Sequence, residues 1–292
     1  MSRVLIATEK PFAAPAVAGI KSILSEAGCE VVLLEKYSAK SELLAAVADV
    51  DAIIIRSDII DQEVFDAAPQ LKIVVRAGAG YDNVDLEAAT AHGVCVMNTP
   101  GQNANAVAEL VFALLLFTVR NRFNGTSGTE LKDKKLGLLA YGNTGRNVAR
   151  IAKGIGMDIY AYDPFTPAEV MQQEGVHPVA SQRELFSTCD IVSLHIPATP
   201  ETKGSIGREL VSLLPKKGIL VNTARKEIIN EPELLELLKE REDLRFLSDI
   251  RPAAHEDYEA ALGERYFSTP KKMGAQTAEA NTNAGLAAAR QI

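Results

Sequence analysis

The chain of 292 residues contains no tryptophan and only three cysteines. Cys29, Cys95 and Cys189 are far apart and lack the spacing of metal ligands, so neither a disulfide framework nor a metal site is expected. Each cysteine lies in an apolar stretch, which predicts three buried and reduced thiols.

Long apolar runs and long basic runs are also missing. No stretch reaches the ~18–20 apolar residues that a membrane-spanning helix needs, and the opening residues MSRVLIATEK form a short strand pattern rather than a signal peptide. The net charge of −7, with no long basic segment, argues against nucleic-acid binding. We therefore predict a cytoplasmic protein with no membrane and no nucleic-acid partner.

What the chain does have is a regular alternation of short apolar runs and helical patterns, which is typical of an α/β fold. Its length indicates two domains. We expect two Rossmann-like, doubly wound domains with a cleft between them: residues 1–97 completed by 275–292, and residues 98–274. The strands expected in the first domain are Val4–Ala7, Val31–Leu34, Ala52–Ile55, Ile73–Val75 and Val94–Met97, with helices around Ala16–Ala27 and Ser41–Val47.

Two further helical segments are unusual in composition. Residues Ala104–Arg120, centred on LVFALLLF, are apolar nearly all round, which predicts burial on several sides, either between domains or in a subunit interface. The alanine-rich segment Gln276–Ile292 follows the last strand, and we expect it to return to the first domain.

The segment Lys135–Phe165 carries the clearest functional pattern. An apolar run, Leu136–Tyr141, leads into the turn Gly142-Asn143-Thr144-Gly145; a helical pattern follows, and a second apolar run ends at Asp163. This order of strand, tight turn, helix, strand and acid is typical of a dinucleotide-binding unit.

Each part of this pattern has a physical reason. Gly142 and Gly145 lack a Cβ atom, so the backbone amides at the start of the helix can approach a pyrophosphate. Asp163, 18 residues after Gly145, is placed to accept from an adenosine ribose hydroxyl, and its charge would repel a 2′-phosphate, which favours NAD over NADP. The first glycine of the usual fingerprint is Ala140 here, and a glycine-rich turn alone is weak evidence.

Other polar residues also end or follow predicted strands, where the functional groups of parallel sheets gather. In the second domain these residues are His195, Arg225 and Asp249. An arginine fork suits a carboxylate substrate, with a surface salt bridge as the alternative. His195 either faces a cofactor or caps its strand, and Asp249 has a cap or turn as its alternative. The strands concerned are Ile191–His195, Ile219–Asn222 and Phe246–Asp249.

In the first domain, Arg56-Ser57 and Arg76-Ala77-Gly78-Ala79-Gly80 stand in similar positions after two strands. Each segment offers a cation, and the second adds glycine-rich backbone whose amides can hold an anion. Together they fit a substrate with two anionic groups, and ordinary turn chemistry is the alternative.

These motifs, with others, closely resemble the D-2-hydroxyacid dehydrogenase family. Beside the dinucleotide fold, the matching segments are VVRAGAGYDNVDLEAATAHGVCVMNTPGQNANAVAEL (Val74–Leu110), DIVSLHIPATPETKGSI (Asp190–Ile206), LVNTARKEIINE (Leu220–Glu231) and TPKKMGAQTAEAN (Thr269–Asn281). The resemblance covers essentially the whole chain.

The resemblance implies an NAD-dependent oxidoreductase that oxidises D-3-phosphoglycerate to 3-phosphohydroxypyruvate, the step that opens L-serine biosynthesis. It also implies that residues 1–97 with 275–292 bind the substrate, that residues 98–274 bind NAD, and that two copies pair through the NAD-binding domain. We expect no regulatory domain after the catalytic core and therefore no feedback inhibition through such a domain.

The resemblance also assigns roles to residues. It places Arg225 and the Gly78–Gly80 backbone at the substrate carboxylate, and it places other polar groups near the phosphate. The substrate-binding residues are expected to be Arg56, Ser57, Arg76, Gly78, Ala79, Gly80 and Asn103. The cofactor contacts are expected to be Gly142, Asn143, Thr144, Gly145, Asp163, His195, Pro197, Thr202, Thr223, Ala224, Asp249 and Gly274, and the catalytic residues Arg225, Lys272 and Lys271.

The chain departs from the family at its acid–base pair, which is usually a histidine and a glutamate. Ala254 stands where the glutamate is expected, and the segment of the histidine reads TPKKMG from Thr269 to Gly274, one residue longer than usual. Counting back from the glycine puts Lys272 at the histidine position, and counting forward from the proline puts Lys271 there. We favour Lys272, because the side that follows matches without a gap. A similar lysine variant is known in short members of the family.

The loss of the glutamate suits a lysine base. An amine with an ordinary pKa of ~10.4 acts as a base only when its surroundings make it give up its proton, and a carboxylate beside it would do the opposite. A second lysine, a nearby arginine and partial burial would each lower the pKa of the amine, as a lysine base requires. We predict that Lys272 takes the hydroxyl proton during oxidation; the alternative is that both lysines only hold the anionic substrate.

Two other functions are alternatives. A glyoxylate or hydroxypyruvate reductase has the same fold, but the second cation set, Arg56 with Ser57, favours a phosphorylated substrate. An NAD(H)-sensing binding protein, similar to a transcriptional co-repressor, would not need catalytic groups, yet Arg225 and Asp249 are retained here. The residues therefore favour the phosphoglycerate-oxidising enzyme.

Overall fold

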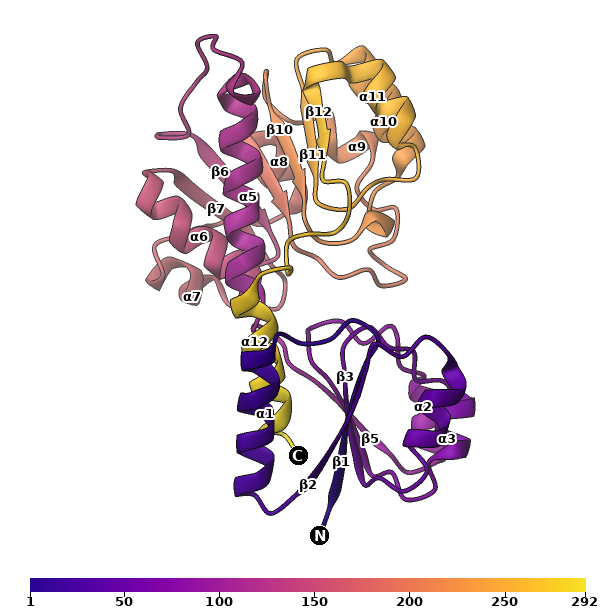
Figure 1. Ribbon diagram of the computed structural model, residues 1–292. Coiled ribbons are helices and arrows are strands. Elements are labelled where there is room, and N and C mark those ends of the chain that lie inside the picture. Colours follow the sequence, from indigo (N-terminus) through magenta and orange to yellow (C-terminus); the bar gives the residue numbers. More distant parts are fainter. The chain divides into compact units, whose positions relative to one another are not determined.

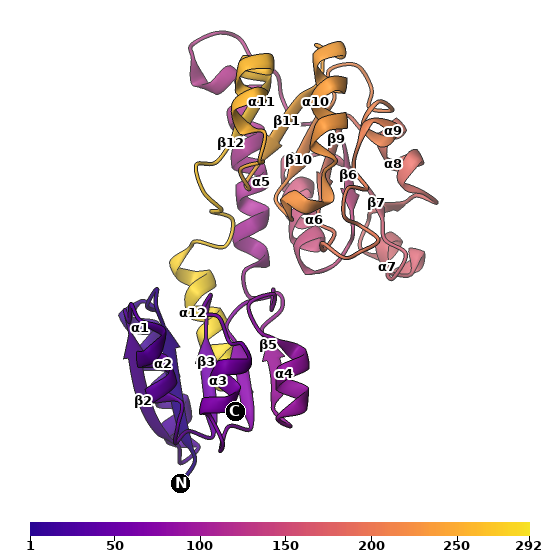
Figure 2. The same ribbon diagram turned by 90° about the vertical axis from the view of Figure 1, so that its right-hand side faces the viewer.

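The computed structural model describes all 292 residues, which divide into two compact units (Figure 1, Figure 2). The first unit comprises Met1–Asn103 and Ala275–Ile292, and the second comprises Ala104–Gly274. Residues 98–103 belong to the first unit, where the Thr99 N–H donates to Gly78 O at 2.9 Å. Each unit contains one parallel sheet, so the predicted α/β class with two doubly wound sheets is confirmed.

The sheet of the first unit has five strands in the order β2-β1-β3-β4-β5. All neighbours pair in parallel, and buried apolar runs such as Ile53–Ile55 are typical of strands that are covered on both faces. The strands are β1 (Arg3–Thr8), β2 (Glu30–Glu35), β3 (Ala52–Ile55), β4 (Ile73–Arg76) and β5 (Cys95–Asn98).

Helices cover both faces of this sheet. On one face α1 (Ala14–Glu26) lies beside α12 (Ala278–Ala289), so the C-terminal segment packs in the first unit (Figure 1). Asp61 and Asp85 begin two helices on the other face, where each carboxylate accepts from a backbone amide of the first turn. The helices of that face are α2 (Lys40–Ala46), α3 (Gln62–Ala67) and α4 (Leu86–Ala91).

The sheet of the second unit has seven strands in the order β12-β11-β10-β9-β6-β7-β8. The direction in which the chain adds strands reverses between β6 and β9, which makes this pair the topological switch point. The strands are β6 (Lys135–Leu139), β7 (Asp158–Tyr162), β8 (His177–Pro178), β9 (Ile191–Leu194), β10 (Ile219–Asn222), β11 (Arg245–Ser248) and β12 (Tyr266–Ser268).

Seven helices cover the two faces of the second sheet. The expected burial of the apolar helix α5 is confirmed: it is exposed only along a stripe that includes Asn105, Glu109, Ala113 and Leu116, the last being 42 % exposed. None of the helices combines the length and the apolar character needed to cross a membrane. One face carries α5 (Ala104–Val119), α6 (Asn143–Ile155) and α7 (Ala168–Gln173); the other carries α8 (Gln182–Thr188), α9 (Arg208–Val211), α10 (Glu231–Glu240) and α11 (His255–Leu262).

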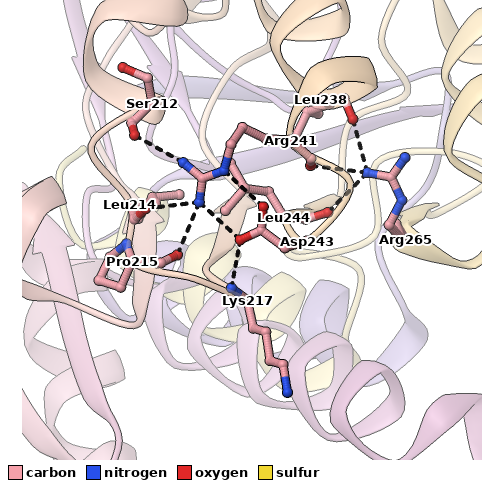
Figure 3. Close-up of polar contacts among 9 residues, drawn as sticks. All are labelled: Ser212, Leu214, Pro215, Lys217, Leu238, Arg241, Asp243, Leu244 and Arg265. Carbon is pink, nitrogen blue, oxygen red and sulfur yellow. Dashed lines mark hydrogen bonds and ion pairs between the residues drawn. The ribbon is translucent and has the colours of Figure 1, made fainter.

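A polar network joins α10 to the start of β11 (Figure 3). The Arg241 guanidinium donates to the Asp243 carboxylate at 2.8 and 2.9 Å and to the carbonyl oxygens of Ser212 and Leu214 at 3.1 and 3.2 Å. The Lys217 N–H donates to Asp243 at 2.9 Å. The bonds from Arg241, with that from Lys217, hold the pKa of Asp243 well below its usual range.

Some expectations were wrong in detail. Cys189 is buried, and burial raises the pKa of its thiol to about 12, but Cys29 is only half-buried and Cys95 is exposed. Cys95 opens the edge strand β5, which no strand covers on its outer side, so apolar neighbours in sequence do not bury it.

Strand β6 ends at Leu139 rather than Tyr141, because Ala140 turns the chain with a φ of +80°. Strands β8 and β12 were not predicted, and they are only 2 and 3 residues long.

Candidate functional site

The candidate residues of the second unit gather at the carboxyl edge of its sheet. Because all of its strands are parallel, the residues that follow β6, β7, β9, β10 and β11 come to this one edge, around the switch point between β6 and β9. Open parallel sheets hold their ligands at this edge. The residues are Ala140–Gly145, Asp163, His195, Thr223–Arg225 and Asp249.

The turn after β6 has the geometry that a pyrophosphate needs. Ala140, at the first glycine position of the fingerprint, has a left-handed φ of +80°, which favours glycine. Gly145 has a packing reason to be glycine, since a Cβ atom there would lie 2.4 Å from Ala140 O. A Cβ atom at Gly142 would meet nothing within 4 Å, so packing does not require this glycine, and the open space beside it fits a phosphate.

Helix α6 begins directly after Gly142, and no side chain caps it. The first backbone N–H groups of the helix, from Asn143 to Gly145, therefore lack a side-chain acceptor at the positive end of the helix dipole. A diphosphate supplies the missing acceptors and the complementary charge. The residues at this turn thus fit the pyrophosphate of a dinucleotide.

Asp163 is held in place at the end of β7. Its Oδ2 accepts from the Tyr141 N–H at 2.7 Å, and its Oδ1 accepts from the Phe165 N–H at 2.8 Å. Each carboxylate oxygen can accept more than one hydrogen bond, so both can still accept from a ribose hydroxyl. The bond to Tyr141 ties the carboxylate to the phosphate turn, which is the arrangement that an adenosine ribose requires.

His195 and Thr223, after β9 and β10, contain buried polar atoms without a partner in the chain. Although His195 as a residue is only half-buried, both of its ring nitrogens are buried and make no hydrogen bond, like the hydroxyl oxygen of Thr223. Burial lowers the pKa of His195 to about 4, so the ring is neutral near pH 7. Buried polar atoms are rarely left unpaired, and these fit the polar groups of a bound cofactor.

The loop after His195 carries two further predicted cofactor contacts, Pro197 and Thr202. The Thr202 hydroxyl donates to Pro197 O at 2.6 Å and accepts from the Thr199 N–H at 2.7 Å. The Thr202 hydroxyl therefore closes this loop and holds Pro197 in place.

Asn222, only 1 % exposed, shapes the segment that carries Arg225. Its Oδ1 accepts from the Ala224 N–H at 3.0 Å, and its Nδ2 donates to Arg225 O at 2.9 Å. The half-buried Arg225 guanidinium donates to Ala224 O at 2.9 Å. The backbone that carries the predicted carboxylate-binding arginine is thus fixed from inside the sheet.

Asp249, also 1 % exposed, is bonded to the segment Thr269–Gly274. Its Oδ1 accepts from the Met273 N–H at 2.7 Å, its Oδ2 accepts from the Gly274 N–H at 2.8 Å, and Thr269 Oγ1 lies 3.0 Å from Oδ1. The carboxylate that was predicted to contact NAD therefore also holds the segment in which the two lysines lie.

Lys271 and Lys272 are both exposed, so the partial burial expected for a lysine base is not present. Ala254, where the family has glutamate, precedes α11, and its N–H donates to Glu231 Oε2 at 2.9 Å. The position therefore has a structural hydrogen bond but brings no carboxylate of its own.

In the first unit, Arg56 follows β3 and is largely occupied by structural bonds. Its Nη1 donates to Lys10 O at 3.0 Å and to Pro11 O at 3.1 Å, and its Nη2 donates to Asn281 Oδ1 of α12 at 2.5 Å. The guanidinium also lies over the Phe12 ring. Arginine has five N–H groups, so part of its donor set is still available to a ligand.

The glycine-rich loop after β4 is held through its carbonyl groups. Gly78 O accepts from the Thr99 N–H at 2.9 Å, and Ala79 O accepts from Asn98 Nδ2 at 2.6 Å. The N–H groups of Ala79 and Gly80 donate to no group of the chain. The loop therefore offers amides, rather than carbonyls, to an anion.

The two predicted arginine segments of the first unit lie together. Arg76 Nε donates to Arg56 O at 2.9 Å, and the exposed Ser57 is the next residue along the chain. Asn103, the last residue of this unit before α5, is half-buried, and no hydrogen bond joins it to this group.

The sequence did not identify the polar residues that hold these segments in place. Three of them are amide or hydroxyl side chains at or directly after the end of a strand, where an unpaired polar group would be costly, and the fourth, Asn281, lies in the first turn of α12. These residues are Asn98, Asn222, Thr269 and Asn281.

Comparison with known proteins agrees with this geometry. Residues 116–262 match the family model described as D-isomer specific 2-hydroxyacid dehydrogenase, NAD binding domain. The D-3-phosphoglycerate dehydrogenase of Methanocaldococcus jannaschii is 38% identical over 275 residues, which cover 87% of this chain and 51% of that protein. The hydroxypyruvate reductase of Thermotoga maritima is 33% identical over 281 residues, which cover 90% of each chain.

A solved structure is similar over nearly its whole length. The crystal structure of NAD⁺-bound 3-phosphoglycerate dehydrogenase from Entamoeba histolytica superimposes with a TM-score of 0.89 at 48% identity, covering 99% of this chain and 93% of that one. By contrast, this chain spans about half the length of the curated D-3-phosphoglycerate dehydrogenases that it matches, 51% and 52% for the first two.

Proposed function

Because this chain belongs to the D-isomer specific 2-hydroxyacid dehydrogenase family, we propose that it oxidises D-3-phosphoglycerate to 3-phosphohydroxypyruvate with NAD, the first step of L-serine biosynthesis. The observation that carries the substrate assignment is the pairing of two arginine segments, in which Arg76 Nε donates to Arg56 O. Two cations beside free backbone amides fit a small acid with both a carboxylate and a phosphate. The identity to the E. histolytica enzyme supports the same substrate.

The second unit is an NAD-binding domain, and its residues fit this cofactor. We assign the pyrophosphate to Gly142–Gly145 at the start of α6 and the adenosine ribose to Asp163. The orphaned polar atoms of His195 and Thr223 would pair with polar groups of the cofactor. When bound, NAD supplies the acceptor for the hydride that leaves C2 of the substrate. The further proposed cofactor contacts are Pro197, Thr202, Ala224, Asp249 and Gly274.

We propose that the first unit binds the substrate, and we assign further roles to two residues of the second unit. Arg225 would orient the substrate carboxylate, since a guanidinium donates two parallel hydrogen bonds to such a group. Lys272 Nζ would accept the C2 hydroxyl proton during oxidation, and its ammonium would return that proton during reduction. Ala254, at the position where the family has glutamate, contributes no carboxylate that would hold the proton on an amine.

The substrate assignment is tested by measuring NAD reduction with D-3-phosphoglycerate and with D-glycerate on the same protein. Loss of the phosphate removes charge-assisted hydrogen bonds worth about 1.5–3 kcal/mol, so kcat/KM is expected to be about 10- to 150-fold higher for the phosphorylated acid. Equal turnover of the two acids would contradict the proposal.

One observation favours a second candidate function. The T. maritima hydroxypyruvate reductase matches this chain over 90% of its own length, whereas the curated D-3-phosphoglycerate dehydrogenases match over about half. A preference for hydroxypyruvate over 3-phosphohydroxypyruvate in NADH oxidation would select this reductase activity. Tight NADH binding without turnover of any 2-hydroxy acid would instead select a nucleotide-sensing binding protein.

The lysine assignment is tested with two neighbouring variants. Lys272→Ala is expected to lower kcat about 100- to 10,000-fold, the usual contribution of a general base, with NADH affinity unchanged. Lys271→Ala is the matched control, and its kcat is expected to stay close to wild type. Normal activity in Lys272→Ala would refute the assignment, and the reverse pattern would transfer the role to Lys271.

A further inference from the structure

The end of strand β11 contains an almost fully buried carboxylate whose bonds all lead to one segment. Asp249 is 1 % exposed, and its own N–H donates to Asn222 O at 2.9 Å, which fixes its backbone against β10. A buried carboxylate needs hydrogen-bond donors to offset its lost hydration. Asp249 obtains two from the N–H groups of Met273 and Gly274, and the Thr269 hydroxyl, 3.0 Å from Oδ1, shares its single proton between the carboxylate and neighbouring carbonyl oxygens.

These donors stand on both sides of the two lysines. On the amino-terminal side, Thr269 Oγ1 lies 2.6 Å from Asp249 O and 2.9 Å from Lys271 O. On the carboxyl-terminal side, the Met273 and Gly274 N–H groups donate to the two oxygens of the carboxylate at 2.7 and 2.8 Å. The backbone that carries the lysines is therefore tied at both ends to a single residue of the sheet.

Gly274 shows how closely the segment approaches this carboxylate. A Cβ atom on Gly274 would lie 2.9 Å from Asp249 Oδ2 and 3.3 Å from a methyl group of Val107 on α5. A side chain at this position would push the segment away from Asp249. The glycine thus permits the bond from its own N–H, which is an observation independent of the bonds themselves.

We propose that Asp249 is a positioning residue that holds the segment Thr269–Gly274 in place, and through it the amine of Lys272. This role is additional to the cofactor contact proposed above. The catalytic consequence rests on the proposed function, because it matters only if Lys272 is the base. The positioning itself is a property of the second unit and can be measured without any substrate.

The first test replaces the carboxylate by its isosteric amide. In Asp249→Asn, one side of the carboxamide is an NH₂ group, which must face either the Met273 N–H or the Gly274 N–H, so two donors oppose each other. We expect trypsin to cleave after Lys271 and Lys272 about tenfold faster than in wild type, because cleavage follows local opening of the segment. Cleavage at other lysines is expected to be unchanged.

The enzymatic readout separates positioning from cofactor binding. A base displaced by about 1 Å loses about 100-fold in rate, so kcat of Asp249→Asn at saturating NAD should fall by about this factor, together with the faster cleavage at the lysines. If Asp249 acted only as a cofactor contact, the NADH dissociation constant would rise and cleavage at the lysines would not change. That result would overturn the proposal.

Two further variants keep the test decisive. Thr269→Val removes the hydroxyl bonds without replacing any residue assigned to NAD, and it is expected to accelerate cleavage at the lysines even if Asp249→Asn does not fold. Asp190→Asn is the matched control, since Asp190 also accepts a backbone bond in this unit, from the Lys135 N–H at 2.9 Å. Unchanged cleavage in Thr269→Val would overturn the proposal.

If D-3-phosphoglycerate is not a substrate, the proposed function fails, but the cleavage and NADH-binding measurements still decide the positioning role.

Discussion

In the turn after β6, Ala140 has a φ of +80°, a conformation in which an L-residue with a Cβ atom is strained. Replacing it by glycine removes about 1–2 kcal/mol of strain but adds about 0.5–1 kcal/mol of conformational entropy to the unfolded chain. We therefore expect Ala140→Gly to raise the free energy of unfolding by about 0.5–1 kcal/mol in chemical denaturation, with NADH binding retained.

The control for this variant is an alanine-to-glycine change at a helical φ. Ala113 is exposed on α5, and glycine at such a position costs about 1 kcal/mol. Ala113→Gly should therefore shift the free energy of unfolding in the opposite direction. Destabilisation by Ala140→Gly would show that the left-handed turn is not strained in solution.

At the same scale, the sequence could locate the charged and glycine-rich positions of the candidate site but not their bonds. Residues that follow parallel strands meet at one edge, so Asp163, Arg225 and Asp249 could be assigned to it from their order alone. The return of the C-terminal helix to the first unit was expected. That Arg56 also donates to Lys10 O and to Asn281 Oδ1 of this helix depends on side-chain direction, which residue order does not specify.

Among the elements, the packing of α9 and α10 against β11 depends on the Arg241 network (Figure 3). Arg241→Ala leaves Asp243 with the bond from the Lys217 N–H and leaves the carbonyls of Ser212 and Leu214 without this donor. We expect the free energy of unfolding at pH 7 to fall by about 2 kcal/mol, since hydrogen bonds to charged groups each contribute about 1.5–3 kcal/mol before solvent screening. Chemical denaturation measures this loss.

The same variant predicts a pH dependence. Because the folded-state pKa of Asp243 is lowered, the stability that it contributes is complete above its unfolded pKa and is lost as the pH falls toward the folded value. The difference in the free energy of unfolding between wild type and Arg241→Ala should therefore be largest at pH 7 and should decrease below about pH 4. Arg208→Ala, which breaks an exposed pair with Glu240, is the control with a much smaller effect. A difference in unfolding free energy that does not depend on pH would contradict the assignment of the lost stability to the Asp243 carboxylate.

The elements that could be predicted are those with a strong pattern of their own. Buried parallel strands such as Ala52–Ile55 and Ile219–Asn222 form continuous apolar runs, and their predicted bounds agree with the structure. Strand β12 is a three-residue edge strand that exists only because β11 pairs with it. Such short segments are specified by their neighbours rather than by local sequence. For the same reason the predicted burial of Cys95, on the edge strand β5, was wrong.

For the whole molecule, the exposed stripe of α5 leads to the proposal that two copies pair through the second unit. Leu116 is 42 % exposed in this stripe, on a helix whose other faces are mostly buried and apolar. The family resemblance implies pairing through the NAD-binding domain, and Leu116 is the one large apolar side chain that is exposed on α5. We therefore expect the wild-type protein to sediment as a dimer at micromolar concentration.

Leu116→Glu places a carboxylate in the proposed interface, where it would lose hydration without gaining a partner. We expect the dimer dissociation constant to rise about 100-fold or more in sedimentation equilibrium, with the fold intact by circular dichroism. Leu86→Glu is the matched control, because Leu86 is 44 % exposed on α4 of the other unit. This variant should leave the dimer dissociation constant unchanged. A wild-type monomer, or a dimer that tolerates Leu116→Glu but not Leu86→Glu, would exclude α5 as the pairing surface.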